Sequence, residues 1–160
     1  MSQRAKELSG RFMNFNQKLI AFVEKCSDEN WGKVCSGENW PVSVVARHIA
    51  AGHYSAIGLA QLIVEGKQLP ELTSEIIDQG NAQHAKKHSN CTKDEVLGIL
   101  REKGSSAAEY IAGLDDADLD RTSNLPLAGG NISAQQCIEN IIINSGTEHL
   151  INMKSATGVR

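Results

Sequence analysis

Two histidines of this sequence, His48 and His149, have the residue type and the spacing of metal ligands. His149 belongs to a stripe that repeats every three to four residues and consists of Ile138, Ile142, Ser145, His149 and Met153. His48 belongs to a comparable stripe with Val44, Val45, Gly52, Ser55 and Leu59. Such stripes face the interior of a helical protein, where an unpaired polar group costs roughly 2 kcal/mol or more. Two inward histidines on separate helices therefore predict a metal site inside a bundle, suited to zinc, nickel or iron.

The position one helical turn before His149 is occupied by Ser145, which is a poor metal ligand. Catalytic zinc normally has three protein ligands and a water, so two histidines alone would make a weak site. Two interpretations follow. Either His48 and His149 hold a metal ion, or they are interior histidines that hydrogen-bond to each other or to Ser145. Glu148 lies about 100° from His149 around the helix, so it is either a general base for a water at this site or a surface acid.

The other three histidines are weaker candidates for the same site. His53 follows His48 by five residues, which is about 140° around an α-helix. We therefore expect His53 to pack against a neighbouring helix or a dimer partner. His84 and His88 have the i, i+4 spacing of metal-binding helices, but their neighbours are Lys86, Lys87, Ser89 and Asn90. These neighbours predict a solvated pair of histidines.

Helical segments must position these residues. The apolar spacing and the start and stop residues predict helices over residues 3–26, 43–66, 74–88, 92–114 and 133–156. Thr92 and Ser133 each begin a capping-box pattern, and Gly66 is a typical helix stop. No long segment alternates as a strand does, although residues 125–127 could pair briefly. The prediction is an all-α four-helix bundle, with long loops at residues 27–42 and 115–131 that allow crossover connections.

The composition predicts an ordinary globular protein in which residues 1–160 form one domain. Hydrophobic residues make up 41% and the net charge is -3, with no basic cluster, so we expect no nucleic-acid partner. The N-terminal residues lack the apolar core of a signal peptide, and no segment is long and apolar enough for a membrane. We therefore expect a soluble, cytoplasmic protein.

The four cysteines show no Cys-x-x-Cys spacing and are Cys26, Cys35, Cys91 and Cys137. In a reducing compartment we expect free thiols. A disulfide between Cys26 and Cys35, across the first long loop, is the alternative.

Three segments taken together resemble the DinB-like family of helical bundles, also called DinB/YfiT-like. Residues 40–50 have a tryptophan followed by a helix that carries His48-Ile49-Ala50, as in the family pattern. Asn81 is followed by an alanine-rich turn and then by Thr92-Lys93-Asp94-Glu95-Val96-Leu97. Residues 149–158 are similar to the closing "His-Leu-Gly-Glu-Ile-Arg…Gly" of the family. The order and spacing of these segments span nearly the whole chain.

This resemblance implies a divalent metal held by three residues, one in the second helix and two that lie one turn apart in the last helix. His48 and His149 match two of these positions, and Ser145 stands at the third, where the family usually has His or Glu. The resemblance further implies a homodimer. Some members of the family look like thiol-dependent transferases or isomerases, in which the metal activates a low-molecular-weight thiol. The resemblance implies a similar activity for this chain.

Two functional hypotheses follow from these residues. The first is a metal-dependent enzyme, for example a thiol transferase or isomerase that acts on a small electrophile, with His48 and His149 as ligands and Glu148 as the candidate catalytic residue. The second is a metal-free, non-catalytic bundle that binds a small ligand or a protein partner. Ser145 favours the second hypothesis, whereas the two histidines favour the first.

Overall fold

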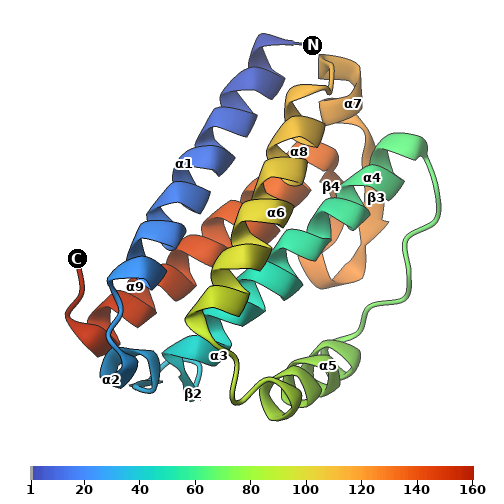
Figure 1. Cartoon of the computed structure of the whole chain (residues 1–160). Coiled ribbons are helices and arrows are strands. Elements are labelled where there is room, and N and C mark those ends of the chain that lie inside the picture. The colour runs from blue at the N-terminus through green and yellow to red at the C-terminus, as the bar shows by residue number, and fades with distance from the viewer. Residues whose placement is uncertain (1) are drawn as a thin grey trace.

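The computed structural model describes residues 2–160, which fold into a bundle of four long helical stretches (Figure 1). The first stretch is α1 (Gln3–Lys25) and the third is α6 (Lys93–Ala112). The second joins α3 (Val42–Arg47), the π-helical η1 (His48–His53), the 3-10 turn η2 (Tyr54–Ala56) and α4 (Ile57–Glu65). The fourth joins α8 (Ala134–Gln136), the π-helical η4 (Cys137–Asn144) and α9 (Ser145–Thr157). The predicted all-α four-helix bundle is confirmed.

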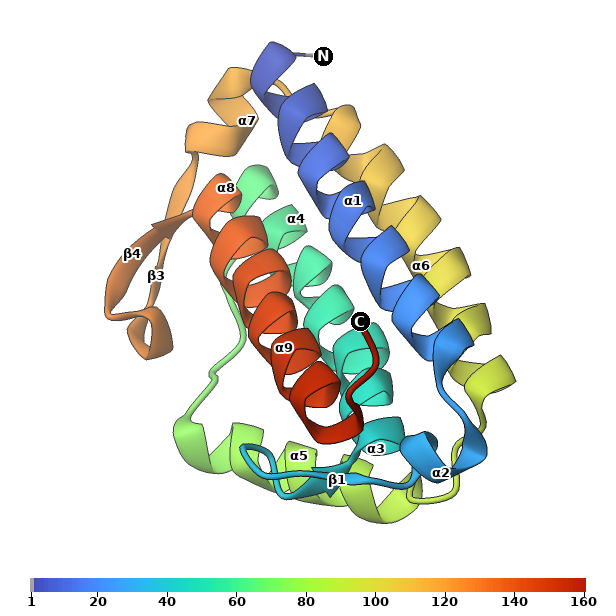
Figure 2. The same ribbon diagram turned by 90° about the vertical axis from the view of Figure 1, so that its left-hand side faces the viewer.

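The four stretches do not simply alternate in direction. The first and the fourth run one way, and the second and third run the other way (Figures 1 and 2). The second and third stretches are therefore parallel, and the chain must return along the bundle between them. Residues 66–73 and the helix α5 (Ser74–Lys87) make this crossover connection. The loops at residues 27–42 and 115–131, for which the sequence allowed crossings, instead join antiparallel stretches, so the crossover lies elsewhere in the chain (Figures 1 and 2).

The ends of the helices follow from local hydrogen bonding. The hydroxyl of Thr92 accepts a hydrogen bond from the Glu95 amide (3.1 Å) and caps α6. Ser133 and Gln136 form the reciprocal capping box that the sequence predicts at the start of α8. Gly66 ends α4 with φ of 68°, a left-handed conformation that glycine adopts without the Cβ penalty.

The core lies between the four stretches and is built from large aliphatic and aromatic side chains. Fully buried examples are Leu8, Phe12, Phe22, Leu19, Ile49, Ile63, Leu100, Ile111, Ile138, Ile142 and Met153. Burial of one such side chain contributes about 1.5–3 kcal/mol. All four cysteines are free and buried in this interior, so the alternative of a Cys26–Cys35 disulfide is wrong.

Short elements occupy the loops on either side of the bundle. The first loop holds α2 (Asp28–Trp31) and the hairpin of β1 (Val34–Cys35) and β2 (Trp40–Pro41). The second holds α7 (Asp116–Asp120) and the hairpin of β3 (Thr122–Leu125) and β4 (Gly130–Ser133). The brief pairing expected at residues 125–127 begins earlier, because the 3-10 turn η3 (Pro126–Ala128) forms the bend of that hairpin.

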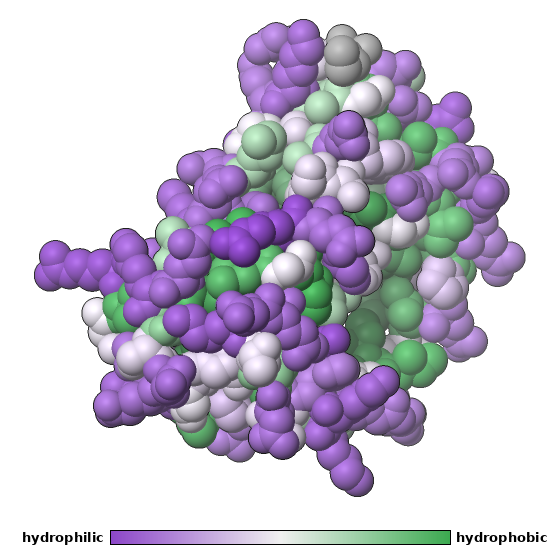
Figure 3. All heavy atoms as spheres, in the orientation of Figure 1, coloured by the Kyte–Doolittle hydropathy of each residue, from purple (hydrophilic) through white to green (hydrophobic). Residues whose placement is uncertain are grey.

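The helix α5 lies across the end of the bundle, apart from the four long stretches (Figures 1 and 2). It contains no buried residue. The space-filling view shows a hollow between α4 and the chain that leads to α5, with apolar side chains around it (Figure 3). Within residues 2–160, every helix is too short or too polar to cross a membrane.

Candidate metal centre

A π-helical turn brings His48 and His53 to the same face of the second stretch. In a π-helix the backbone hydrogen bond joins residues five apart, instead of four as in an α-helix. His48 and His53 are the first and last residues of η1, and their ring centroids lie 4.7 Å apart. The expectation that His53 points away from His48 is therefore wrong, because it assumed α-helical geometry throughout this segment.

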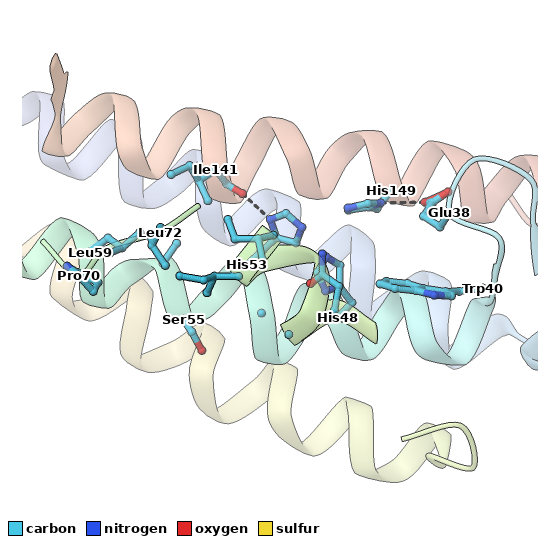
Figure 4. A pocket seen from close by; sticks show the side chains of 16 residues that line it. Glu38, Trp40, His48, His53, Ser55, Leu59, Pro70, Leu72, Ile141 and His149 are labelled. Atoms are coloured by element: carbon cyan, nitrogen blue, oxygen red, sulfur yellow. Dashed lines mark hydrogen bonds and ion pairs between the residues drawn. The ribbon is translucent and has the colours of Figure 1, made fainter. Parts of the chain in front are cut away.

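His149 completes a group of three imidazoles. Its ring centroid lies 5.4 Å from that of His48 and 5.1 Å from that of His53. One ring nitrogen from each of the three histidines lies within 4.8 Å of the others, so the three could hold one metal ion. The three rings meet at one end of a cavity, where α9 passes the second stretch (Figure 4). His48 and His149 thus converge as the sequence predicts, and His53 joins them.

Two of the three rings are fixed by a hydrogen bond at Nδ1. Nδ1 of His53 lies 2.7 Å from the Ile141 carbonyl oxygen, and Nδ1 of His149 lies 2.8 Å from Oε2 of Glu38. A backbone carbonyl and an ionised carboxylate both accept hydrogen bonds, so each Nδ1 carries a proton, and in a neutral ring Nε2 then keeps a free lone pair. Nε2 of His53 is buried and has no hydrogen-bond partner among residues 2–160. An orphaned acceptor of this kind suits a metal ligand.

Burial favours the neutral form of two of these imidazoles, His48 and His53. Burial, followed by the neighbouring histidines His53, His149 and His84, lowers the pKa of His48 to about 3. Burial also lowers the pKa of His53, although its hydrogen bond to Ile141 opposes this shift. Neutral imidazole is the form that binds metals. Burial therefore holds His48 and His53 in the form that can bind a cation near neutral pH.

Glu38 is the acidic residue of the site, and sequence reasoning missed it. Its side chain is only 7% exposed, and it also accepts hydrogen bonds from Nδ2 of Asn152 (3.0 and 3.2 Å). It lies in the turn between β1 and β2, where Asn39 has the left-handed φ of 59° that asparagine tolerates. A carboxylate that holds a histidine through Nδ1 is the usual outer support of a metal ligand. Nothing in the local sequence distinguishes Glu38 from other loop acids.

Ser145 and Glu148 do not reach the three histidines. The hydroxyl of Ser145 donates to the carbonyl of Asn140 (2.9 Å), five residues earlier, because Ser145 directly follows the π-helical η4. Glu148 is exposed on the surface of α9. Neither residue lines the cavity beside the histidines, so the structure supports the surface interpretation of Glu148.

His84 lies near the site but outside the group of three. Its ring centroid is 5.9 Å from that of His48 and 6.4 Å from that of Trp40. Both of its ring nitrogens are buried without a partner among the described residues, and burial lowers its pKa to about 4. The expectation that His84 is solvated is therefore wrong. Its ring lies beside that of His88 in a tilted arrangement, with 5.2 Å between the ring centroids.

The cavity beside the three histidines has a volume of about 730 Å³, within the range of small-molecule sites. Glu38, Trp40 and the histidines form one end. Leu59, Pro70 and Leu72 lie at the other end (Figure 4). The Trp40 indole and the His48 ring are in edge-to-face contact, with 5.3 Å between ring centroids. The arrangement places a potential metal ion at the polar end of a cavity whose remaining lining is mostly apolar.

The fold is similar to that of one solved structure, YfiT from Bacillus subtilis, which is described as a probable metal-dependent hydrolase with an unusual four-helix bundle topology. The two chains superpose with a TM-score of 0.76 and share 16% sequence identity, over 100% of this chain and 91% of YfiT. No curated protein sequence matches this chain significantly. The sequence model of the DinB superfamily matches residues 14–145. This chain is therefore a member of the DinB superfamily.

Proposed function

We propose that this protein is a metal-dependent enzyme in which His48, His53 and His149 hold a divalent metal ion. The observation that carries this proposal is the group of three imidazoles, with ligand atoms within 4.8 Å of one another. The orphaned Nε2 of His53 supports it. A second source of support is YfiT, which has a similar fold and is described as a probable metal-dependent hydrolase.

The donor set fits a catalytic metal site. Three protein ligands with one position left for a water or a substrate are typical of catalytic zinc. Zinc is the first candidate because it binds three imidazoles readily, and nickel and iron also accept imidazole. The bound metal would polarise a carbonyl oxygen and lower the pKa of a water or thiol that it binds.

The residues of the chain would then have separate tasks. Glu38 holds the ring of His149 through a hydrogen bond. Its negative charge makes that ring a stronger electron-pair donor to the metal. The Ile141 carbonyl holds the ring of His53 in the same way. Trp40 packs against the ring of His48. Such fixed surroundings limit the reorganisation that a reaction would require.

Hydrolysis of a small molecule is the reaction class that the site supports best, since the open cavity adjoins the proposed ligands. The family resemblance favours a second candidate, transfer of a low-molecular-weight thiol to an electrophile. One assay separates the two: a panel of carboxylic esters and amides, with and without added thiol. Metal-dependent turnover without thiol supports hydrolysis, and turnover only with thiol supports transfer. A metal-loaded protein that turns over nothing would favour the metal-free ligand-binding bundle or a different chemistry.

The test of the metal site itself is a zinc titration of protein purified without an affinity tag. We expect tight binding of one zinc ion by the wild type, and a loss of at least about tenfold in affinity for His53→Ala, because a direct ligand is removed. His88→Ala is the matched control, since His88 is a histidine outside the group of three. Equal affinity in the wild type and His53→Ala would refute the proposed ligand set.

A further inference from the structure

The cavity next to the three histidines is divided into a polar end and an apolar wall. Resting on the proposed function, we infer that the substrate is an uncharged, mostly apolar molecule. Its reactive polar group would lie at the histidine end and its apolar part between α4 and α5.

The wall is built from aliphatic side chains of four different segments. Leu59 comes from α4, Ile141 from η4, Pro70 and Leu72 from the segment 66–73, and Ile76 and Ile77 from α5. Ile76 and Ile77 are 47% and 38% exposed, although they are among the largest apolar side chains of α5. They do not belong to the protein core, so their apolar surface remains free to contact a ligand.

The charges around the cavity argue against an ionic substrate. The lining contains no lysine or arginine, so it offers no cationic side chain for a carboxylate or phosphate. Its acidic residue, Glu38, is already paired with His149 and Asn152. Lys103, in α6, donates a hydrogen bond to the hydroxyl of Ser55 (3.3 Å). The side chain of Ser55 points toward α6 and away from the histidines (Figure 4). An ionic tail between α4 and α5 would therefore find no cationic partner in the lining and would lie against apolar side chains, which costs free energy.

Two dyes with the same aromatic skeleton test this inference. N-phenyl-1-naphthylamine is uncharged, and 1-anilinonaphthalene-8-sulfonate is the same molecule with a sulfonate. Both fluoresce more strongly in apolar surroundings, so their dissociation constants can be measured by titration. Chelator-treated protein is used so that the sulfonate cannot bind a metal. We expect the uncharged dye to bind at least about tenfold more tightly than the anionic dye, because the wall cannot neutralise a charge.

Two glycine substitutions show whether the dye occupies this cavity. Gly80 lines the cavity, and a Cβ added to it would have no atom within 4 Å. Gly80→Leu should therefore fold and fill part of the cavity. Gly98 in α6 is also an exposed helical glycine with free space around it, but it lies outside the cavity. We expect Gly80→Leu to weaken binding of the uncharged dye at least about tenfold and Gly98→Leu to leave it nearly unchanged, because only the former reduces the cavity volume.

Zinc titrations of the same two variants separate this inference from the proposed function. Both variants should bind zinc as the wild type does, because neither glycine belongs to the group of three histidines. Failure of zinc binding in the wild type would refute the metal site and would leave the dye result intact. Absence of dye binding, tighter binding of the anionic dye, or equal binding by Gly80→Leu and Gly98→Leu would overturn the inference about the substrate.

Discussion

His48 and His53 are five residues apart in the chain, and their rings are in edge-to-face contact with 4.7 Å between centroids. The π-helical η1 makes this contact, because its hydrogen bonds span the same five residues. π-helical turns are rare and occur often at functional sites. In the proposed site, this turn brings His53 into the group of three histidines. His53 thereby replaces the ligand that is missing at Ser145.

The charge of Glu38 should increase metal affinity through His149. Glu38→Gln keeps an oxygen that can accept from Nδ1 of His149 but removes the negative charge. We expect zinc affinity to fall by about 10- to 100-fold, as is common for outer partners of metal ligands. Competition with a chromophoric chelator measures this change. Asn152→Ala, which removes only the amide that supports Glu38, should have a smaller effect, and wild-type affinity in Glu38→Gln would contradict the prediction.

Ser145 should be dispensable for metal binding in this chain. Its hydroxyl is engaged with the Asn140 carbonyl, so Ser145→Ala should bind zinc as the wild type does. His149→Ala, one turn later, should lose at least about tenfold in affinity, because it removes a direct ligand. Calorimetric titration of both variants with zinc measures these affinities. A clear loss of zinc affinity in Ser145→Ala would show that the third family position still contributes to the site.

The buried cysteines should make the protein less stable at alkaline pH. Burial raises the pKa of Cys35, with a smaller contribution from Glu38, and burial raises that of Cys137, in each case from 9.0 to about 11. Above pH 9 the unfolded chain releases these protons while the folded chain retains them. The free energy of unfolding should therefore be intact below about pH 8.5 and should fall as the pH rises toward 11. Urea denaturation at pH 7.5 and pH 10 measures this loss, and Cys137→Ala should reduce its size. An equal free energy of unfolding at pH 7.5 and pH 10 would contradict the raised pKa values of these cysteines.

Gly146 should be required where α9 crosses α1. A Cβ added at this position would lie 2.5 Å from Cζ of Phe15. Gly146→Ala should therefore destabilise the fold by about 1–3 kcal/mol through overpacking. Gly10→Ala is the matched control, since Gly10 is an exposed helical glycine where an added Cβ would have no atom within 4 Å. It should gain up to about 1 kcal/mol from helix propensity. Thermal or urea unfolding compares the two, and equal stability would argue against the close crossing.

The sequence predicted the helices well because their start and stop residues act locally. Ser133 and Gln136 form their capping box within four residues, and Gly66 adopts its left-handed conformation where the second stretch ends. The convergence of His48 and His149 was also predictable, since each lies on an inward stripe. These features depend only on neighbours in the chain and on helical periodicity.

The remaining parts of the site depend on contacts that periodicity does not encode. His53 was misplaced because hydropathy does not distinguish a π-helical turn from an α-helical one. Glu38 lies 111 residues from His149, and its inward direction depends on the β1–β2 hairpin. His84 was misplaced because its local sequence is polar, whereas its ring packs against Trp40 and His48 from a different segment.

Because α5 is separate from the bundle, much of the cavity wall can change in proteins of this architecture without a change in the core. The proposed ligands lie on stretches that also form the core, so substitutions near them would disturb folding. Much of the cavity wall lies on residues 66–73 and on α5, where no residue is buried. Substitutions there can change the shape and polarity of the wall at little cost in stability, since surface changes usually alter it by less than about 0.5 kcal/mol. The fold thus allows new specificities to arise by mutation while the histidine centre is inherited unchanged.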